Sequence, residues 1–191
     1  MGLQVATIAR LPIEGSRDYY IYLLDYGWDE PIAEALRDNF EFLAKSCSEN
    51  NAVIVKGFDA KEFNNEIFAY HSIDGEAAVE LLPALLVTKT NPAYFARDVD
   101  QRRTKAYKVN EVDNFILVPV RKFCKKASEV PGLLESIMKD ISEGESLCNF
   151  QVSRQVARKE SRFSWLMLEP NIYGVGVRMP KLFEYLRRES I

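Results

Sequence analysis

The sequence predicts an α/β protein, and three observations lead to this fold class. Short runs of β-branched and aromatic residues alternate with segments whose apolar residues recur every three or four positions. Glycine, proline and asparagine residues separate these segments. Of the 191 residues 47% are apolar, including 11 Phe and 9 Tyr, which is sufficient for a substantial packed core. Alternating strands and helices are typical of a sheet that is covered by helices.

The predicted elements begin with a weakly alternating edge strand over residues 3–10. Residues 19–24, YYIYLL, have the aromatic and β-branched composition of a strand. From Pro31 the apolar residues fall at steps of three and four, so we expect one amphipathic helix that ends near residues 50–51. The residues that mark its apolar face are Ile32, Leu36, Phe40, Leu43 and Cys47.

A second group of elements follows this helix. Residues 52–56, AVIVK, are a short apolar run between turn residues, which predicts a buried strand. Residues 61–70 are predicted to form a helix and residues 76–82 a shorter one. Pro83 then directly precedes another predicted strand, ALLVTKT, which an Asn-Pro pair ends.

This order of elements, with a proline directly before the last strand, resembles the thioredoxin fold over residues 3–96. The segment YLLDYGW resembles the family's central strand and the start of its active-site loop. AVIVKGFDAKEFNNEIFAYHSIDG resembles its second buried strand and the helix beyond. LLPALLVTKTNP resembles the strand whose preceding proline is usually cis. The resemblance implies a thioredoxin-like domain over residues 1–96.

The stretch in which this family carries its redox dithiol contains no cysteine in this chain. Residues 27–31 at this place are Gly-Trp-Asp-Glu-Pro. In the family the following helix N-terminus lowers a thiol pKa and produces a thiolate nucleophile. Cys47 falls instead at the far end of the predicted helix, where the helix dipole disfavours a thiolate. We therefore expect a domain without a CxxC motif and without thiol-disulfide oxidoreductase activity.

The second half of the chain is predicted to be a charged connection over residues 97–114 and then a smaller α/β module over residues 115–191, packed on the first domain. The connection is polar and its apolar residues have no clear period. The elements predicted in the module are strands at 115–120, 165–168 and 173–179 and helices at 128–144, 147–162 and from Pro180 onward.

The cysteines and the histidine form no recognised catalytic or metal-binding pattern. Cys47, Cys124 and Cys148 are widely spaced, and the single histidine, His71, is near none of them in sequence. A zinc site needs about four closely spaced ligands. We expect reduced and mostly buried thiols, a structural or surface histidine, and neither a metal nor another cofactor.

Four carboxylates lie near the loop that replaces the dithiol, and they are Asp25, Asp29, Glu30 and Glu34. Paired carboxylates can perform acid–base chemistry or hold a metal when they converge in a pocket. Helix initiation before Pro31 explains the middle two more simply. We therefore predict no catalytic residue and favour a protein that is not an enzyme.

A basic stretch over residues 97–126 offers two interpretations. Its predicted binding residues are Arg102, Arg103, Lys105 and Lys108, and Arg121, Lys122, Lys125 and Lys126 extend it. Interleaved tyrosine and phenylalanine residues would suit a single-stranded nucleic acid. Because the whole chain is acidic, with a pI near 5.4, a solvated loop or a site for an acidic protein is the alternative that we favour.

Tyr26, Trp28 and Pro83 are the other predicted binding residues. The resemblance implies that the loop with Trp28 and the turn before Pro83 form an exposed apolar groove that holds extended peptides. Trp and Tyr are frequent anchors of protein interfaces. The alternative interpretation is that Trp28 fills the core.

The two halves of the chain have opposite charge. Residues 1–96 contain 7 basic and 15 acidic residues, a net charge of −8, whereas residues 97–191 contain 18 basic and 13 acidic residues, a net charge of +5. This asymmetry favours a protein partner or self-association. We therefore predict a redox-inactive, protein-binding adaptor subunit of a cytoplasmic complex.

Two alternative functions stay open. One is an enzyme with an unrecognised small-molecule site. The other is a nucleic-acid-associated accessory protein of a bacterial antiviral defence system, because EPNIYGVGVRMPKL resembles C-terminal segments of such proteins. The start of the chain lacks the pattern of a signal peptide, and no apolar run approaches about 18 residues, so we expect a cytoplasmic protein without a membrane segment.

Overall fold

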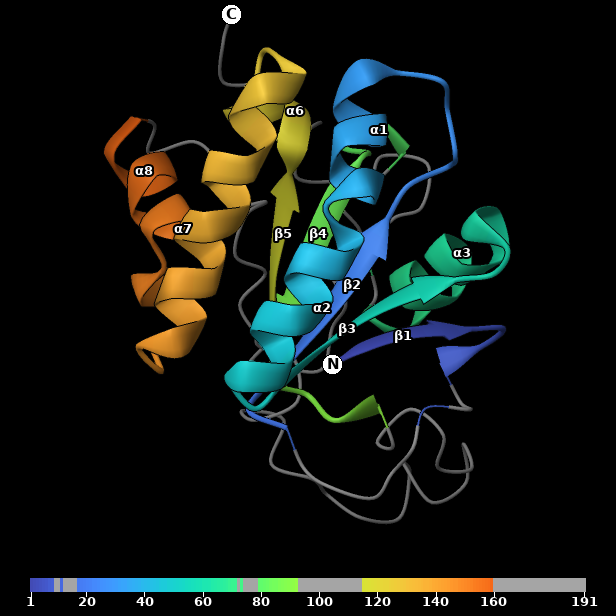
Figure 1. Ribbon diagram of the computed structural model, residues 1–191, viewed down its shortest axis with the longest axis horizontal. Coiled ribbons are helices and arrows are strands. Elements are labelled where there is room, and N and C mark those ends of the chain that lie inside the picture. The colour runs from blue at the N-terminus through green and yellow to red at the C-terminus, as the bar shows by residue number, and fades with distance from the viewer. Residues whose placement is uncertain (9–10, 12–16, 72, 74–78, 93–114, 160–191) are drawn as a thin grey trace, which may run out of the picture.

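The computed structural model describes residues 1–8, 11, 17–71, 73, 79–92 and 115–159. These residues form a mixed α/β fold around one sheet (Figure 1). The sheet consists of strands β1 (Gly2–Val5), β2 (Tyr19–Leu24), β3 (Ala52–Gly57), β4 (Ala84–Thr88) and β5 (Phe115–Pro119), in the spatial order β1-β3-β2-β4-β5. The predicted α/β fold class is confirmed.

The sheet has a parallel part and an antiparallel part. Strands β1, β3 and β2 are parallel, and Ile21 of β2 lies opposite Ile54 of β3. Strand β4 runs antiparallel to β2, with Val87 opposite Ile21, and β5 runs antiparallel to β4. Parallel neighbours need a crossover connection, which explains why helices separate β2 from β3 in the sequence.

All six side chains of β2 are buried, so this central strand has a core on each face. Tyr19, Ile21 and Leu23 belong to one hydrophobic cluster. Tyr20, Tyr22 and Leu24 belong to another. Successive side chains of a strand point to opposite faces, so a strand covered on both sides has no polar alternation. This is the physical origin of the continuous apolar run YYIYLL.

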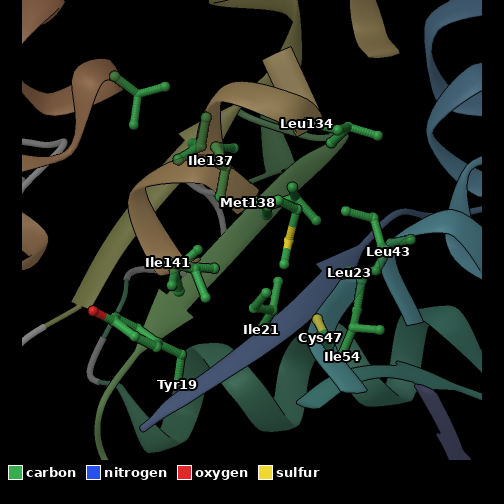
Figure 2. Close-up of a cluster of buried hydrophobic side chains, with 14 of the residues drawn as sticks. Tyr19, Ile21, Leu23, Leu43, Cys47, Ile54, Leu134, Ile137, Met138 and Ile141 are labelled. Carbon is green, nitrogen blue, oxygen red and sulfur yellow. The ribbon is translucent and has the colours of Figure 1, made fainter. Parts of the chain in front are cut away.

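Helices α1 (Pro31–Asp38), α2 (Phe40–Glu49) and α7 (Val130–Ser142) cover one face of the sheet (Figure 1). Figure 2 shows Met138 of α7 above Ile21 of β2, with Leu43 and Cys47 of α2 beside Leu23. Helix α8 (Gln151–Lys159) packs against α7, and Gln151 donates its backbone N–H to the buried Asp140 at 2.6 Å. Residues from both ends of the described chain therefore build one core.

Helix α3 (Ala60–Tyr70) covers the opposite face. It begins at Asp59, whose side chain accepts the backbone N–H of Glu62 at 2.8 Å, which satisfies one of the free donors of its first turn. Its buried side chains Phe63, Ile67 and Phe68 recur at helical spacing. The result is a sheet between two helical layers.

The predicted helix from Pro31 to residues 50–51 is wrong in one respect, because it is divided into α1 and α2 at Asn39. The Asn39 side chain donates to the backbone carbonyl of Ala35 at 2.7 Å. Asparagine competes in this way with backbone hydrogen bonding and is therefore frequent at helix ends. Because the apolar spacing continues across Asn39, the sequence pattern alone does not show that the helix is divided there.

The sheet continues across the division of the chain that the sequence predicts at residues 97–114, which lie outside the described residues. Strand β5 pairs with β4, with Leu117 opposite Leu86, and α7 packs on the same core as α1 and α2. Residues 115–159 thus extend the sheet of the first half.

Val120, predicted as the end of a strand, begins the short helix α6 (Val120–Phe123). Two 3₁₀ turns, Ala127–Glu129 and Leu147–Asn149, precede α7 and α8, and the elements predicted beyond residue 162 also lie outside the described residues.

Gly57→Ala is predicted to destabilise the fold. A Cβ atom at Gly57 would lie 2.3 Å from Cβ of Phe63 and 2.7 Å from the carbonyl oxygen of Asp59, so α3 would have to move away from β3. We expect the free energy of unfolding to fall by about 1–3 kcal/mol in urea denaturation. Gly132→Ala is the control, because a Cβ atom there meets nothing within 4 Å. Equal stability of the two variants would contradict the predicted clash.

Candidate functional site

The loop that follows β2 is held by a network around Asp25. Gly27 donates its backbone N–H to Oδ1 of Asp25 at 3.1 Å, and Arg37 of α1 forms an ion pair with Oδ2. Gly27 has a φ of 72°, a conformation that glycine adopts at no steric cost. Asn64 of α3 donates to the backbone carbonyl of Asp25 at 3.1 Å. Both helical layers therefore fix the start of this loop.

Trp28 lies at the tip of the loop and is 44% exposed, so it does not fill the core. Its backbone carbonyl accepts from Nη1 and Nη2 of Arg37 at 3.3 and 3.2 Å. The ring of Tyr26 lies 5.6 Å from the Trp28 ring, between centroids. The guanidinium carbon of Arg121 lies 5.6 Å from the Trp28 ring centroid, a cation–π distance. The indole is thus exposed and also held in place by its neighbours.

Pro83 directly precedes β4 and therefore lies at the end of the sheet where β2 leads into this loop. The peptide bond between Leu82 and Pro83 is cis. Leu24 at the end of β2 is opposite Ala84, and Ala84 is opposite Pro119 at the end of β5. The buried Pro83 accepts the backbone N–H of Val120 at 2.9 Å.

Arg121 connects the segments that meet at this end of the sheet. It follows Val120, contacts the Trp28 ring and forms an ion pair with Glu30. We refer to this constellation as the Trp28 site, and its residues are Tyr26, Trp28, Glu30, Pro83 and Arg121. It contains an exposed aromatic surface, one cation and one carboxylate.

Of the predicted binding residues, Tyr26 and Trp28 are in ring contact, and Pro83 is buried at the same end of the sheet. Arg102, Arg103, Lys105 and Lys108 lie outside the described residues. From the sequence, Arg121 is expected only to extend the basic stretch, and Glu30 is one of four carboxylates near the loop, best explained by helix initiation. Their ion pair joins residues 91 positions apart, and no local pattern signals such a contact.

The three thiols are free, and none of them belongs to the loop that carries Trp28. Burial raises the pKa of Cys47 to about 12 and also raises the pKa of Cys124. Cys148 is exposed, with Sγ 3.1 Å from Oγ of Ser146. Residues 25–31 contain no cysteine, so a thiolate cannot form at the start of α1.

His71 is buried at the end of α3, between aromatic rings. Its ring centroid lies 5.0 Å from that of Phe115 and 6.1 Å from that of Tyr22. Desolvation lowers the pKa of His71 from 6.5 to about 4, so the imidazole is neutral near pH 7. It lies in the core on the α3 side of the sheet and does not belong to the Trp28 site.

Within the described part of the chain, no group of three or more His, Cys, Asp or Glu side chains is arranged to hold a metal ion. None of the helices in that part has the length and apolar character of a membrane span. No protein-family model, curated protein or solved structure matches the chain. The site is therefore interpreted from its own geometry.

Thiol reactivity is predicted to differ strongly between the three cysteines. In the native protein we expect Ellman's reagent to modify Cys148 quickly, whereas the buried Cys47 and Cys124 react only on unfolding, because their raised pKa values leave little thiolate. Cys148→Ser should remove the rapid phase, and the buried Cys47→Ser should leave it unchanged. Rapid reaction of two or more thiols in the native wild type would contradict this prediction.

His71 is predicted to make stability depend on pH below neutrality. Because the pKa of His71 is lower in the folded state, the unfolded state binds the proton more tightly. The contribution of neutral His71 to the free energy of unfolding is therefore fully present above about pH 6.5 and is lost as the pH decreases toward about 4. We expect this loss to lower the free energy of unfolding by about 3 kcal/mol. Urea unfolding at several pH values measures it. His71→Phe should flatten the slope in this window, and an unchanged slope would contradict the assignment.

Proposed function

We propose that this chain is a redox-inactive, thioredoxin-like protein that binds a protein partner through the Trp28 site. The observation that carries the proposal is an exposed tryptophan that Arg37, Tyr26 and Arg121 hold in place, at the end of the sheet where the cis-proline also lies. This end of the sheet is also where the resemblance described above implies a peptide-binding groove.

The topology supports the thioredoxin-like part of the proposal. The strand order β1-β3-β2-β4-β5 combines three parallel strands with two antiparallel ones, and helices lie on both faces. A cis-proline directly precedes β4, at the position where the resemblance implies one. The loop between β2 and α1, the family's place for its dithiol, is the loop that carries Trp28.

The chemistry of the loop favours binding over thiol exchange. Asp29 and Glu30 occupy the stretch before Pro31, and neither is a redox group. Cys47 lies near the opposite end of the helical segment and is fully buried, so it can act neither as the attacking nor as the resolving thiol at this site. What the site retains is a surface for recognition.

The residue types and their immobilisation suit a protein interface. Trp, Tyr and Arg are the residues most enriched among binding hot spots, and Trp28, Tyr26 and Arg121 are grouped here. The loop is held by Arg37 and Asp25 before a partner arrives, which lowers the entropy lost on binding. An exposed indole that is already fixed is therefore a suitable anchor.

The proposal is tested by affinity capture from the cytoplasm of the source cell at low and moderate salt. We expect Trp28→Ala to reduce capture of the specific partner about tenfold or more, the effect typical of a hot-spot residue. Phe42→Ala is the matched control, because Phe42 is 42% exposed on α2 and lies outside the Trp28 site. Partners should be identified by mass spectrometry and rebound as purified proteins.

Two outcomes would contradict the proposal. One is equal capture by wild type and Trp28→Ala. The other is recovery of nucleic acid alone, lost as salt rises and abolished by Arg102→Glu with Arg103→Glu, which would favour the nucleic-acid alternative.

A further inference from the structure

The ion pair between Arg121 and Glu30 occupies the cationic part of the Trp28 site. Oε2 of Glu30, the residue before Pro31, meets Nη2 of Arg121, the second residue of α6. The guanidinium also lies against the Trp28 ring. Both charged side chains are partly exposed, at 37% for Arg121 and 29% for Glu30. A ligand that reaches Trp28 therefore also reaches this pair.

The pairing leaves one donor of the guanidinium unsatisfied. Nε of Arg121 is buried and has no hydrogen-bond partner among the described residues. Glu30 contacts Nη2, whereas a carboxylate that binds a guanidinium in the strongest geometry accepts two parallel N–H donors. A buried donor without a partner is unfavourable, so Glu30 satisfies this arginine only in part. A carboxylate that took the place of Glu30 and engaged both Nε and Nη2, with the guanidinium shifted so that Nε is accessible, would satisfy it better.

Glu30 can be released without becoming an unfavourable charge. It is the N-cap residue of α1, and its side chain makes no capping hydrogen bond. Once separated from Arg121, its carboxylate stays near the positive end of the helix dipole and in contact with water. The competing carboxylate is thus held weakly enough to be exchanged.

We propose that Arg121 recognises an aspartate or glutamate side chain of the partner, and that Glu30 occupies this subsite in the free protein. This inference rests on the proposed function and specifies the partner as an acidic, extended segment that places one carboxylate beside Trp28. Three further cations with exposed side chains follow Arg121 and favour such a segment, and they are Lys122, Lys125 and Lys126.

If a partner's carboxylate replaces Glu30 at Arg121, substitutions of these two residues should change binding in ways that a purely structural ion pair would not. Removal of the Glu30 charge should strengthen partner binding, because the intramolecular competitor is lost. Removal of the Arg121 charge should weaken partner binding, and the remaining affinity should no longer depend on the partner's carboxylate. A structural pair would instead lose binding in both variants, together with stability.

The experiment selects ligands from a phage library of random linear peptides on the immobilised full-length chain. Selected peptides are synthesised with their Asp and Glu residues intact or replaced one at a time by Asn and Gln. Their affinities are measured by fluorescence anisotropy for wild type, Trp28→Ala, Glu30→Gln, Arg121→Gln and Lys122→Gln. Thermal melts establish that each variant is folded, and Lys122→Gln controls for loss of a neighbouring positive charge.

We expect one acidic position in the peptides whose amide replacement weakens binding to wild type about tenfold, and less than about twofold to Arg121→Gln. Glu30→Gln should bind the acidic peptide several times more tightly than wild type. If peptides require Trp28 but no acidic position depends on Arg121, or Glu30→Gln weakens binding, the inference is wrong and the proposed function stands. If no peptide depends on Trp28, the proposed function itself is wrong.

Discussion

The central strand β2 has to bury its side chains on two opposite faces, and the rest of the fold follows from this requirement. Tyr19, Ile21 and Leu23 need one apolar layer, and Tyr20, Tyr22 and Leu24 need another. Helices α1, α2 and α7 supply the first layer, and α3 supplies the second (Figure 1). Neighbouring strands on both sides satisfy the backbone of β2, so its hydrogen bonds and its side chains are both removed from water.

The polar end of this strand produces the candidate site. Asp25 directly follows Leu24 and is still buried. A buried carboxylate is unfavourable unless hydrogen bonds or an ion pair compensate for its lost hydration. Arg37, Gly27 and Asn64 engage its carboxylate and its backbone carbonyl. The same contacts hold Trp28 outside the core, with its carbonyl bound to Arg37. A structural need at the end of a buried strand therefore presents an aromatic surface to solvent.

The Trp28 site contains a pair of opposite charges. Glu30 and Arg121 form this pair beside Trp28, whereas the buried His71 packs against Tyr22 and Phe115. Among the described residues of the Trp28 site, Tyr26 carries a hydroxyl group, and none carries a thiol or an imidazole. The opposite charges of the two halves of the chain meet in this pair, which couples the acidic first half to the basic segment that follows β5.

The sequence by itself determined the elements whose signals are local. Two-sided burial is visible in YYIYLL, the apolar period identifies α7, and Pro83 marks the start of β4. Tyr26 and Trp28 can be selected as candidate binding residues from their residue types together with the resemblance to the thioredoxin fold, and Pro83 from that resemblance alone. The tertiary structure decided the division of the long helix at Asn39, the addition of β5 to the sheet and the pairing of Glu30 with Arg121. Each of these depends on side-chain competition or on contacts between segments far apart in the chain, and periodicity carries no information about either.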